Sequence, residues 1–352
     1  MHPIVKWAAP VLTALAVAPV FSQTAVTTPA PAPTVAEFIK VDQPGVLADR
    51  KKVAIGSFTL QLVRDQGIER SAGTFGMFQA QSATYFTQTR IDPATLQAVA
   101  DRLYDTFVAE LKAGGVDVVP QAQLDADPDY QELRKVAVAS PFSDTLNTGR
   151  GRDQVMGVNV LTAAKGLPII SNGLQDKKWF PTQTEGYGSL IKVVLGGATT
   201  AKTLQAPLLH VKLALSMVEL KGRGWGGSSQ FGNLTLKSAS WEFGADPLPR
   251  FVEGGTAVLV SGADLSGQPS ARGLLTLAKA MPVTGLELAA SAGEGGNSRG
   301  SGLLGALARA ASGTNTTAAD AYLDVEPANF SDRVADGAGP MLRLFVQAMT
   351  TR

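Results

Sequence analysis

The segment from Lys51 to Val119 restricts the folds open to this chain more than any other part of it. Residues 51–63 alternate apolar and small side chains, which predicts a strand. Asp92-Pro93 then predicts a helix start, because Asp is a favoured N-cap and Pro fits the first turn. The helix, 93–113, carries apolar residues at three-to-four spacing and ends at a glycine pair before a short apolar strand. This strand–helix–strand order predicts an α/β fold.

The rest of the chain extends this prediction to a mixed α+β sheet with flanking helices and a long protruding hairpin. Residues 208–220 form the best single strand, in which an apolar face from Leu209 to Met217 alternates with a face carrying His210. A glycine-rich turn at 222–227 and an extended run at 231–243 would complete the hairpin. Further expected elements are a loop or irregular hairpin at 65–90, a polar helix and loop at 124–146, strands at 158–164, 167–170, 256–260 and 322–325, a loop at 176–188, and helices at 303–311 and 330–349, the last interrupted near 337–340.

The first 22 residues have the order of a secretory signal peptide. Lys6 gives a positive start, residues 7–20 are mostly apolar, and Val20 and Ser22 are small enough for the cleavage site. The apolar run holds two prolines and is shorter than the roughly 20 residues that span a bilayer, which disfavours an uncleaved anchor. We therefore expect cleavage after Ser22 and a periplasmic or secreted protein.

The domain organisation follows from composition after the cleavage site. Residues 23–36 are rich in Pro, Ala and Thr and predict an extended linker. Residues 37–352 are expected to form one α/β envelope domain, which could subdivide near 245–255.

Composition excludes several classes of chemistry. The chain has no cysteine, so thiolate catalysis, thiolate metal sites and a lipidated cysteine are excluded. Its 31 basic and 30 acidic residues leave a net charge of +1, which gives no general attraction to nucleic acid or anionic lipid. We expect no cofactor, no nucleic-acid partner and at most peripheral membrane contact.

Three motifs that suggest chemistry have a simpler interpretation. Gly222, Gly224 and Gly227 match G-x-G-x-x-G, but strand rather than helix is expected to follow, so a hairpin turn is favoured over dinucleotide binding. The alternate aspartates at 125, 127 and 129 lack the glycine and glutamate of a calcium loop and are interpreted as a solvated helix start. His210 has no second histidine in the mature chain and is expected to be a hydrogen-bonded or surface residue, not a ligand or base. No catalytic or metal-binding residue is predicted.

Aromatic side chains supply the candidate partner contacts. The glycine-rich turn and the segment at 65–90 are the expected contact surfaces, because a tryptophan inside a glycine run is hard to bury by its own turn. The residues concerned are Trp225, Phe231, Trp241, Phe75, Phe78, Tyr85 and Phe86.

The segment from Lys51 to Leu124 resembles a known group of periplasmic α/β domains. It runs KKVAIGSF, an insertion, a helix ending AELKAGG, and then VDVVPQAQLD. This order is similar to the curli secretion protein CsgG, the N-terminal domain of TolB and the LpoB-type lipoproteins. The resemblance implies an envelope protein that acts by assembly or protein binding. CsgG and LpoB are lipidated on a cysteine, so the absence of cysteine argues against lipid anchoring here.

The sequence therefore predicts an exported, non-enzymatic envelope protein that binds other envelope proteins or further copies of itself, as a secretion or outer-membrane accessory factor. Two alternatives stay open. One is a secreted hydrolase that uses carboxylates or a serine, which requires a concave site with clustered carboxylates of perturbed pKa. The other is a subunit of an oligomeric pore, built from the long hairpin.

Overall fold

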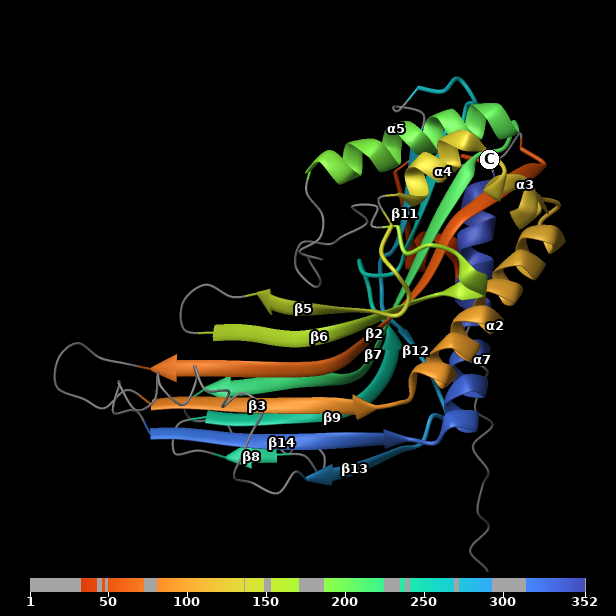
Figure 1. Cartoon of the computed structure of the whole chain (residues 1–352). Helices are drawn as coiled ribbons and strands as arrows, with labels where there is room; N and C mark the ends of the chain where they lie inside the picture. The colour runs from red at the N-terminus through yellow and green to blue at the C-terminus, as the bar shows by residue number, and fades with distance from the viewer. Residues whose placement is uncertain are drawn as a thin grey trace, which may run out of the picture. The chain divides into compact units, whose positions relative to one another are not determined.

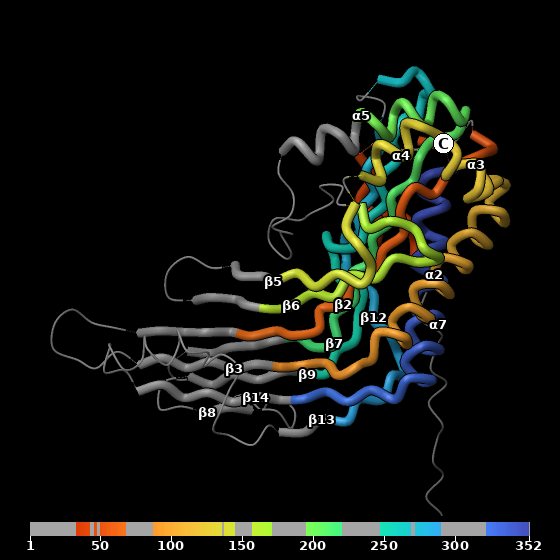
Figure 2. Tube along the Cα trace, in the orientation of Figure 1, coloured from red at the N-terminus to blue at the C-terminus, as the bar shows by residue number. Residues whose placement is uncertain are grey.

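The computed structural model describes residues 33–42, 46–47, 50–72, 81–135, 137–148, 153–170, 187–224, 235–237, 241–268, 272–292 and 315–351. Figure 2 traces the chain. The predicted export signal, most of the predicted linker and the predicted helix at 303–311 lie outside these residues. The last two linker residues, Val35 and Ala36, belong to the short helix α1 (Val35–Phe38), and Pro33–Arg352 forms one compact unit.

The described strands join in one mixed sheet, as an α/β fold requires (Figure 1). β2 pairs parallel with β7 and antiparallel with β3, and β3 pairs parallel with β14. The central order is β1 (Ile39–Val41), β11 (Arg272–Leu277), β10 (Ala257–Ser261), β7 (Leu208–Gly224), β2 (Lys52–Ala72), β3 (Gln81–Arg90), β14 (Asn315–Val325) and β13 (Leu288–Ala292).

The long strand β2 changes neighbours halfway along its length. Residues 54–63 pair with β7, whereas residues 65–72 pair with β3. Beyond this point β7 pairs with β9 instead. Three of the remaining strands lie next to β2: β4 (Asp117–Val118) and β6 (Asp153–Ala163) pair with β2, and β5 (Phe142–Thr148) pairs with β6. The other three lie next to β7: β9 (Trp241–Phe251) pairs with β7, and both β8 (Thr235–Lys237) and β12 (Met281–Pro282) pair with β9.

Two long helices, α2 (Pro93–Ala113) and α7 (Pro327–Thr350), pack together on one face of the sheet (Figure 1). The apolar face predicted for 208–220 lies under them, because alternate strand residues point to the same side. The core that they share with the sheet includes Phe58, Leu60, Leu62, Leu209, Val211, Leu213, Leu215, Met217, Leu96, Val99, Leu103, Phe107, Phe330, Val334, Met341 and Phe345.

A second, smaller helical layer forms a separate apolar cluster with Ala54 and Leu208, which lie on the other side of the sheet from the α2–α7 core. It consists of α3 (Gln121–Asp125), α4 (Pro128–Arg134) and α5 (Tyr187–Leu204), and the single-turn helix η1 (Ala164–Gly166) follows β6. The core of this layer includes Val119, Leu124, Tyr130, Leu133, Ile170 and Leu204. A three-layer α/β/α arrangement thus covers both faces of one half of the sheet.

Several predicted elements agree with the structure. The helix at 93–113 has the predicted bounds, with Asp92 as N-cap, and the strands predicted at 51–63, 208–220, 256–260 and 322–325 are present. Of the two alternatives predicted for 65–90, the loop is wrong and the hairpin is present, but the hairpin is regular: β2 continues to Ala72 and pairs antiparallel, in register, with β3. The predicted hairpin partner at 231–243 is displaced: β7 pairs with β9, at 241–251. In the range 245–255, near which the domain could subdivide, β9 runs without a break as far as Phe251.

Two helices differ from expectation. α5 occupies residues 187–204, where no helix was expected. The closing helix begins earlier than predicted and continues through Pro340 without interruption. Proline costs a helix one backbone hydrogen bond, but α7 buries Ala338, Met341 and Leu342 around Pro340, and this packing stabilises the helix through the proline.

Candidate binding cleft

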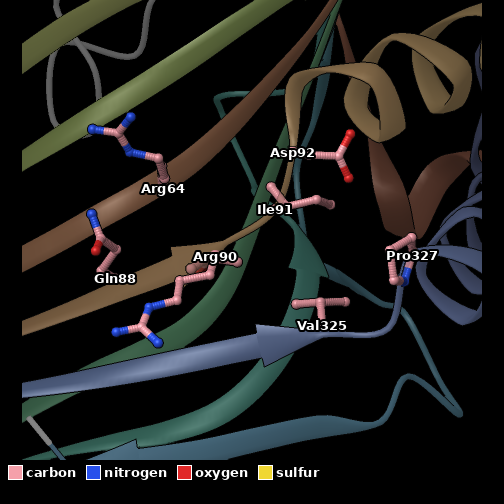
Figure 3. Close-up of a pocket in the computed structure, with 8 residues that line it drawn as sticks. Arg64, Gln88, Arg90, Ile91, Asp92, Val325 and Pro327 are labelled. Carbon is pink, nitrogen blue, oxygen red and sulfur yellow. The ribbon is translucent and has the colours of Figure 1, made fainter.

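An open cleft of about 540 Å³ lies where α2 and α7 begin and the sheet continues past them (Figure 3). The strands β2, β3 and β14 form its floor. Two of its walls come from the junctions in which β3 leads into α2 and β14 leads into α7. The lining residues are Arg64, Gln88, Thr89, Arg90, Ile91, Asp92, Val325 and Pro327.

The two junctions repeat one pattern. β3 ends in Arg90-Ile91-Asp92-Pro93, and β14 ends in Asp324-Val325-Glu326-Pro327. Each is a charged residue, an aliphatic residue, an acidic N-cap and a proline at the first helical position. Because the strands are parallel and Arg90 pairs with Asp324 in register, the two junctions lie side by side. The chain thereby brings together residues more than 200 positions apart.

Both acidic caps are committed to their own helices. Asp92 accepts hydrogen bonds from the backbone N–H of Thr95 at 2.8 Å and from its hydroxyl at 2.6 Å. The Thr95 side chain and backbone together lower the pKa of the Asp92 carboxyl below its usual value. Glu326 accepts from the N–H groups of Ala328 and Asn329. These carboxylates satisfy helix-terminal N–H groups and are therefore not free acid–base groups.

A β-bulge delivers Arg64 to the cleft. The register of β2 against β6 shifts between Val63 and Asp65, so that Arg64 is the extra residue. A bulge changes the direction in which the following side chains point. Gly157 lies beside the bulge, and a Cβ atom there would stand 2.6 Å from the carbonyl oxygen of Asp65. A glycine at 157 thus permits the close approach of the two backbones.

We predict that Gly157→Ala lowers the free energy of unfolding by about 1–3 kcal/mol, because backbone rather than a flexible side chain must move. Urea unfolding followed by circular dichroism measures the change. Gly339→Ala is the matched control: nothing lies within 4 Å of the new Cβ, and alanine favours the helix, so its stability should be unchanged or slightly higher. Equal stability of the two variants would show that the bulge does not need glycine.

The two arginines of the cleft differ in how firmly they are held. Arg64 donates from Nε and Nη2 to the two carboxylate oxygens of Asp65, at 3.0 and 2.9 Å, and Gln88 donates to the same carboxylate at 3.2 Å. Arg90 has half of its side chain exposed, and its Nη1 is 3.6 Å from Asp324, beyond hydrogen-bond distance. Its guanidinium carbon lies 3.8 Å from the ring centroid of Tyr322. A face stacked on a tyrosine leaves the N–H edge of the guanidinium available.

The lining divides into a polar and an apolar side. Figure 3 shows the side-chain ends of Arg64, Gln88 and Arg90 on one side, and Ile91, Val325 and Pro327 on the other. Ile91 and Val325 are partly buried against the main core. In the same view the carboxylate of Asp92 points toward α2, away from the arginines. The cleft thus offers a guanidinium edge next to a small apolar surface.

The sheet face that carries His210 is buried instead of exposed. His210 is fully buried, and its Nδ1 shares a 3.0 Å hydrogen bond with the hydroxyl of Ser57 on β2. Its environment includes Gly197 of α5, whose Cβ position would be 3.8 Å from Nε2. Burial lowers the pKa of His210 to about 4. The histidine is therefore a neutral residue that joins β7 to β2, in agreement with the hydrogen-bonded alternative.

The aspartates at 125, 127 and 129 belong to helix ends. Asp127 is the N-cap of α4 and accepts from the N–H of Tyr130 at 2.8 Å. Asp125 pairs with Arg134 at 2.7 Å. Among the described residues, no group of three or more His, Cys, Asp or Glu side chains lies close enough together to hold a metal ion.

The aromatic contact candidates fall largely outside what the structure describes. Four of them, Phe75, Phe78, Trp225 and Phe231, are outside the described residues. Tyr85 and Phe86 lie on β3 and Trp241 on β9, with their backbones described and their side chains not. Sequence reasoning missed Arg64 and Arg90; the repeated junction pattern ending in an acidic residue and a proline was the signal that could have found Arg90.

Comparison with known proteins adds no relative. No family model, curated protein or solved structure matches the chain. Within the described residues, no helix is both long and apolar enough to cross a membrane.

Proposed function

We propose that this protein is exported to the cell envelope and acts there by binding another envelope protein or a further copy of itself. The observation that carries the proposal is the way the sheet continues past its helices. α2 and α7 begin at the junctions, while β2, β3, β6 and β14 run on to form what we call the sheet extension, residues 65–72, 81–88, 153–158 and 315–322 (Figure 1). In Figure 1, α2 and α7 lie beside the junctions and do not reach over this part of the sheet.

A sheet face of this kind suits recognition of a partner. The described part of the extension next to the helices carries charged and amide side chains, including Asp65 and Gln88, and Arg64 adjoins it. Polar sheet surfaces beside a cleft favour specific and reversible contacts rather than a permanent apolar interface. The predicted signal peptide and the resemblance to CsgG, TolB and LpoB domains support the envelope as the place where this binding occurs.

The test combines fractionation with site-specific crosslinking in the native cell. Glu69 and Thr84 pair across β2 and β3. A photoreactive amino acid at either position of the full-length chain should crosslink it to its partner, in an adduct of defined mass. The same amino acid at Gln131, on the exposed part of α4, is the control and should give none. Adducts that are absent from both extension positions, or an unprocessed chain confined to the cytosol, would refute the proposal.

A further inference from the structure

We propose that the cleft between the two junctions binds a carboxylate carried on a small apolar group, with Arg90 as its anchor. In the setting of the proposed function, on which this inference rests, such a group is the C-terminal residue of a partner polypeptide with an apolar side chain. A free organic acid has the same chemistry and is distinguished by the experiment below.

Arg90 is the guanidinium of the cleft that can accept a new partner. Arg64 already makes a two-point interaction with Asp65. Among the residues that the structure describes, Arg90 has a 3.6 Å approach to Asp324 and a stacking contact with Tyr322, which fixes the plane of its guanidinium. A fixed planar guanidinium can donate two parallel hydrogen bonds to a carboxylate, which is the geometry that favours arginine for this ligand.

The acidic residues nearby leave the hydrogen-bonding edge of Arg90 open. Asp324, the carboxylate paired with Arg90, lies 3.6 Å from Nη1 and forms an ion pair without a hydrogen bond. Asp65 is neutralised by Arg64, and Asp92 and Glu326 are hydrogen-bonded to the first turns of their own helices. The positive ends of those two helices also face the junctions, which offsets the charge of the caps. The helix termini are thus occupied by their caps, and the ligand is assigned to Arg90 alone.

The apolar side of the cleft determines which group the bound carboxylate carries. Ile91, Val325 and Pro327 lie across from the guanidinium ends in Figure 3. A carboxylate bound at Arg90 would place an attached aliphatic side chain near these residues. Burying that side chain adds an attraction that a bare anion, such as chloride or acetate, would lack.

Methyl NMR of the full chain, labelled at Ile and Val methyl groups, tests the inference. N-acetyl-leucine should shift the Ile91 and Val325 methyl signals in a saturable way, whereas N-acetyl-leucine amide should bind at least about tenfold more weakly, because it lacks the charge that Arg90 recognises. Arg90→Gln should weaken binding of the acid by at least about tenfold, and Arg90→Lys should give an intermediate loss. Arg134→Gln is the matched control and should bind normally, because it removes an arginine on α4 that is paired with Asp125 and does not line the cleft.

A tripeptide ending in leucine separates the two sources of the carboxylate. Tighter binding of acetyl-Ala-Ala-Leu than of N-acetyl-leucine supports a polypeptide C-terminus, and equal binding supports a free organic acid; both results keep the anchor role of Arg90. Equal binding of acid and amide, or identical titrations of Arg90→Gln and Arg134→Gln, would overturn the inference. Since these probes need no partner, crosslinks at Glu69 without probe binding would reject the cleft and leave the proposed function standing.

Discussion

Lowering the pH from about 6.5 to about 4 is expected to cost the protein about 3 kcal/mol of stability through His210 alone. The folded protein keeps this histidine neutral until about pH 4, because burial disfavours the charged imidazolium. The unfolded chain binds the same proton near pH 6.5. Between these two values the unfolded state binds more protons than the folded state, so stability falls as the pH falls. Below about 4 both states are protonated, and this contribution changes no further.

Urea unfolding of the full chain at several pH values between 7.5 and 4 measures the effect. His210→Gln removes the titrating group and keeps a side chain able to hydrogen-bond to Ser57, so its stability should change much less over this window. Ser57→Ala is the matched control: it removes the hydrogen-bond partner but leaves the histidine in place, so its pH dependence should persist. Asp92 and Asp264, whose pKa values are lowered by hydrogen bonds, affect the stability at pH values below this window. Parallel curves for wild type and His210→Gln would contradict the prediction.

Local sequence patterns were sufficient to predict the elements whose own side chains specify them. Helix α2 begins at Asp92-Pro93 and ends before Gly114, as its capping residues indicate. The alternation of 208–220 predicts the strand and the face that enters the core. It does not reveal that the opposite face, with His210, is buried too, because that burial depends on α5 and the second helical layer.

Other features could not be predicted because they depend on tertiary contacts. The bulge at Arg64 shifts the strand alternation by one residue, so the alternation predicts a strand end at Val63 although the two halves of β2 are continuous. Pro340 suggests a break that the packing of α7 overrides. The cleft needs Arg90 and Val325 to be neighbours, and only the parallel pairing of β3 with β14 brings them together. Charges at the two junctions were therefore visible in the sequence, but their proximity was not.

Phe58→Ala is expected to lower the free energy of unfolding by about 3–5 kcal/mol. Phe58 is fully buried where β2 meets α2, with ring centroids of Tyr104 and Phe107 at 5.7 and 5.9 Å. The ring of Tyr104 meets it edge-on at 85°, an orientation that aromatic pairs favour. Alanine would remove the ring, its dispersion contacts and both aromatic pairs, and would leave a cavity that close-packed neighbours cannot fill.

The same unfolding measurement on two further variants shows whether the loss comes from this aromatic contact. Phe58→Leu keeps most of the volume and should cost less than about 1.5 kcal/mol. Thr106→Ala, at a partly exposed position of the same helix, should change stability by no more than about 0.5 kcal/mol. Because the junction that leads into α2 supplies Arg90 and Ile91, a weakened α2–β2 interface should also weaken ligand binding in the cleft. A loss of less than about 1 kcal/mol for Phe58→Ala would mean that α2 is not held to the sheet by this contact, and the geometry of the cleft would then need another support.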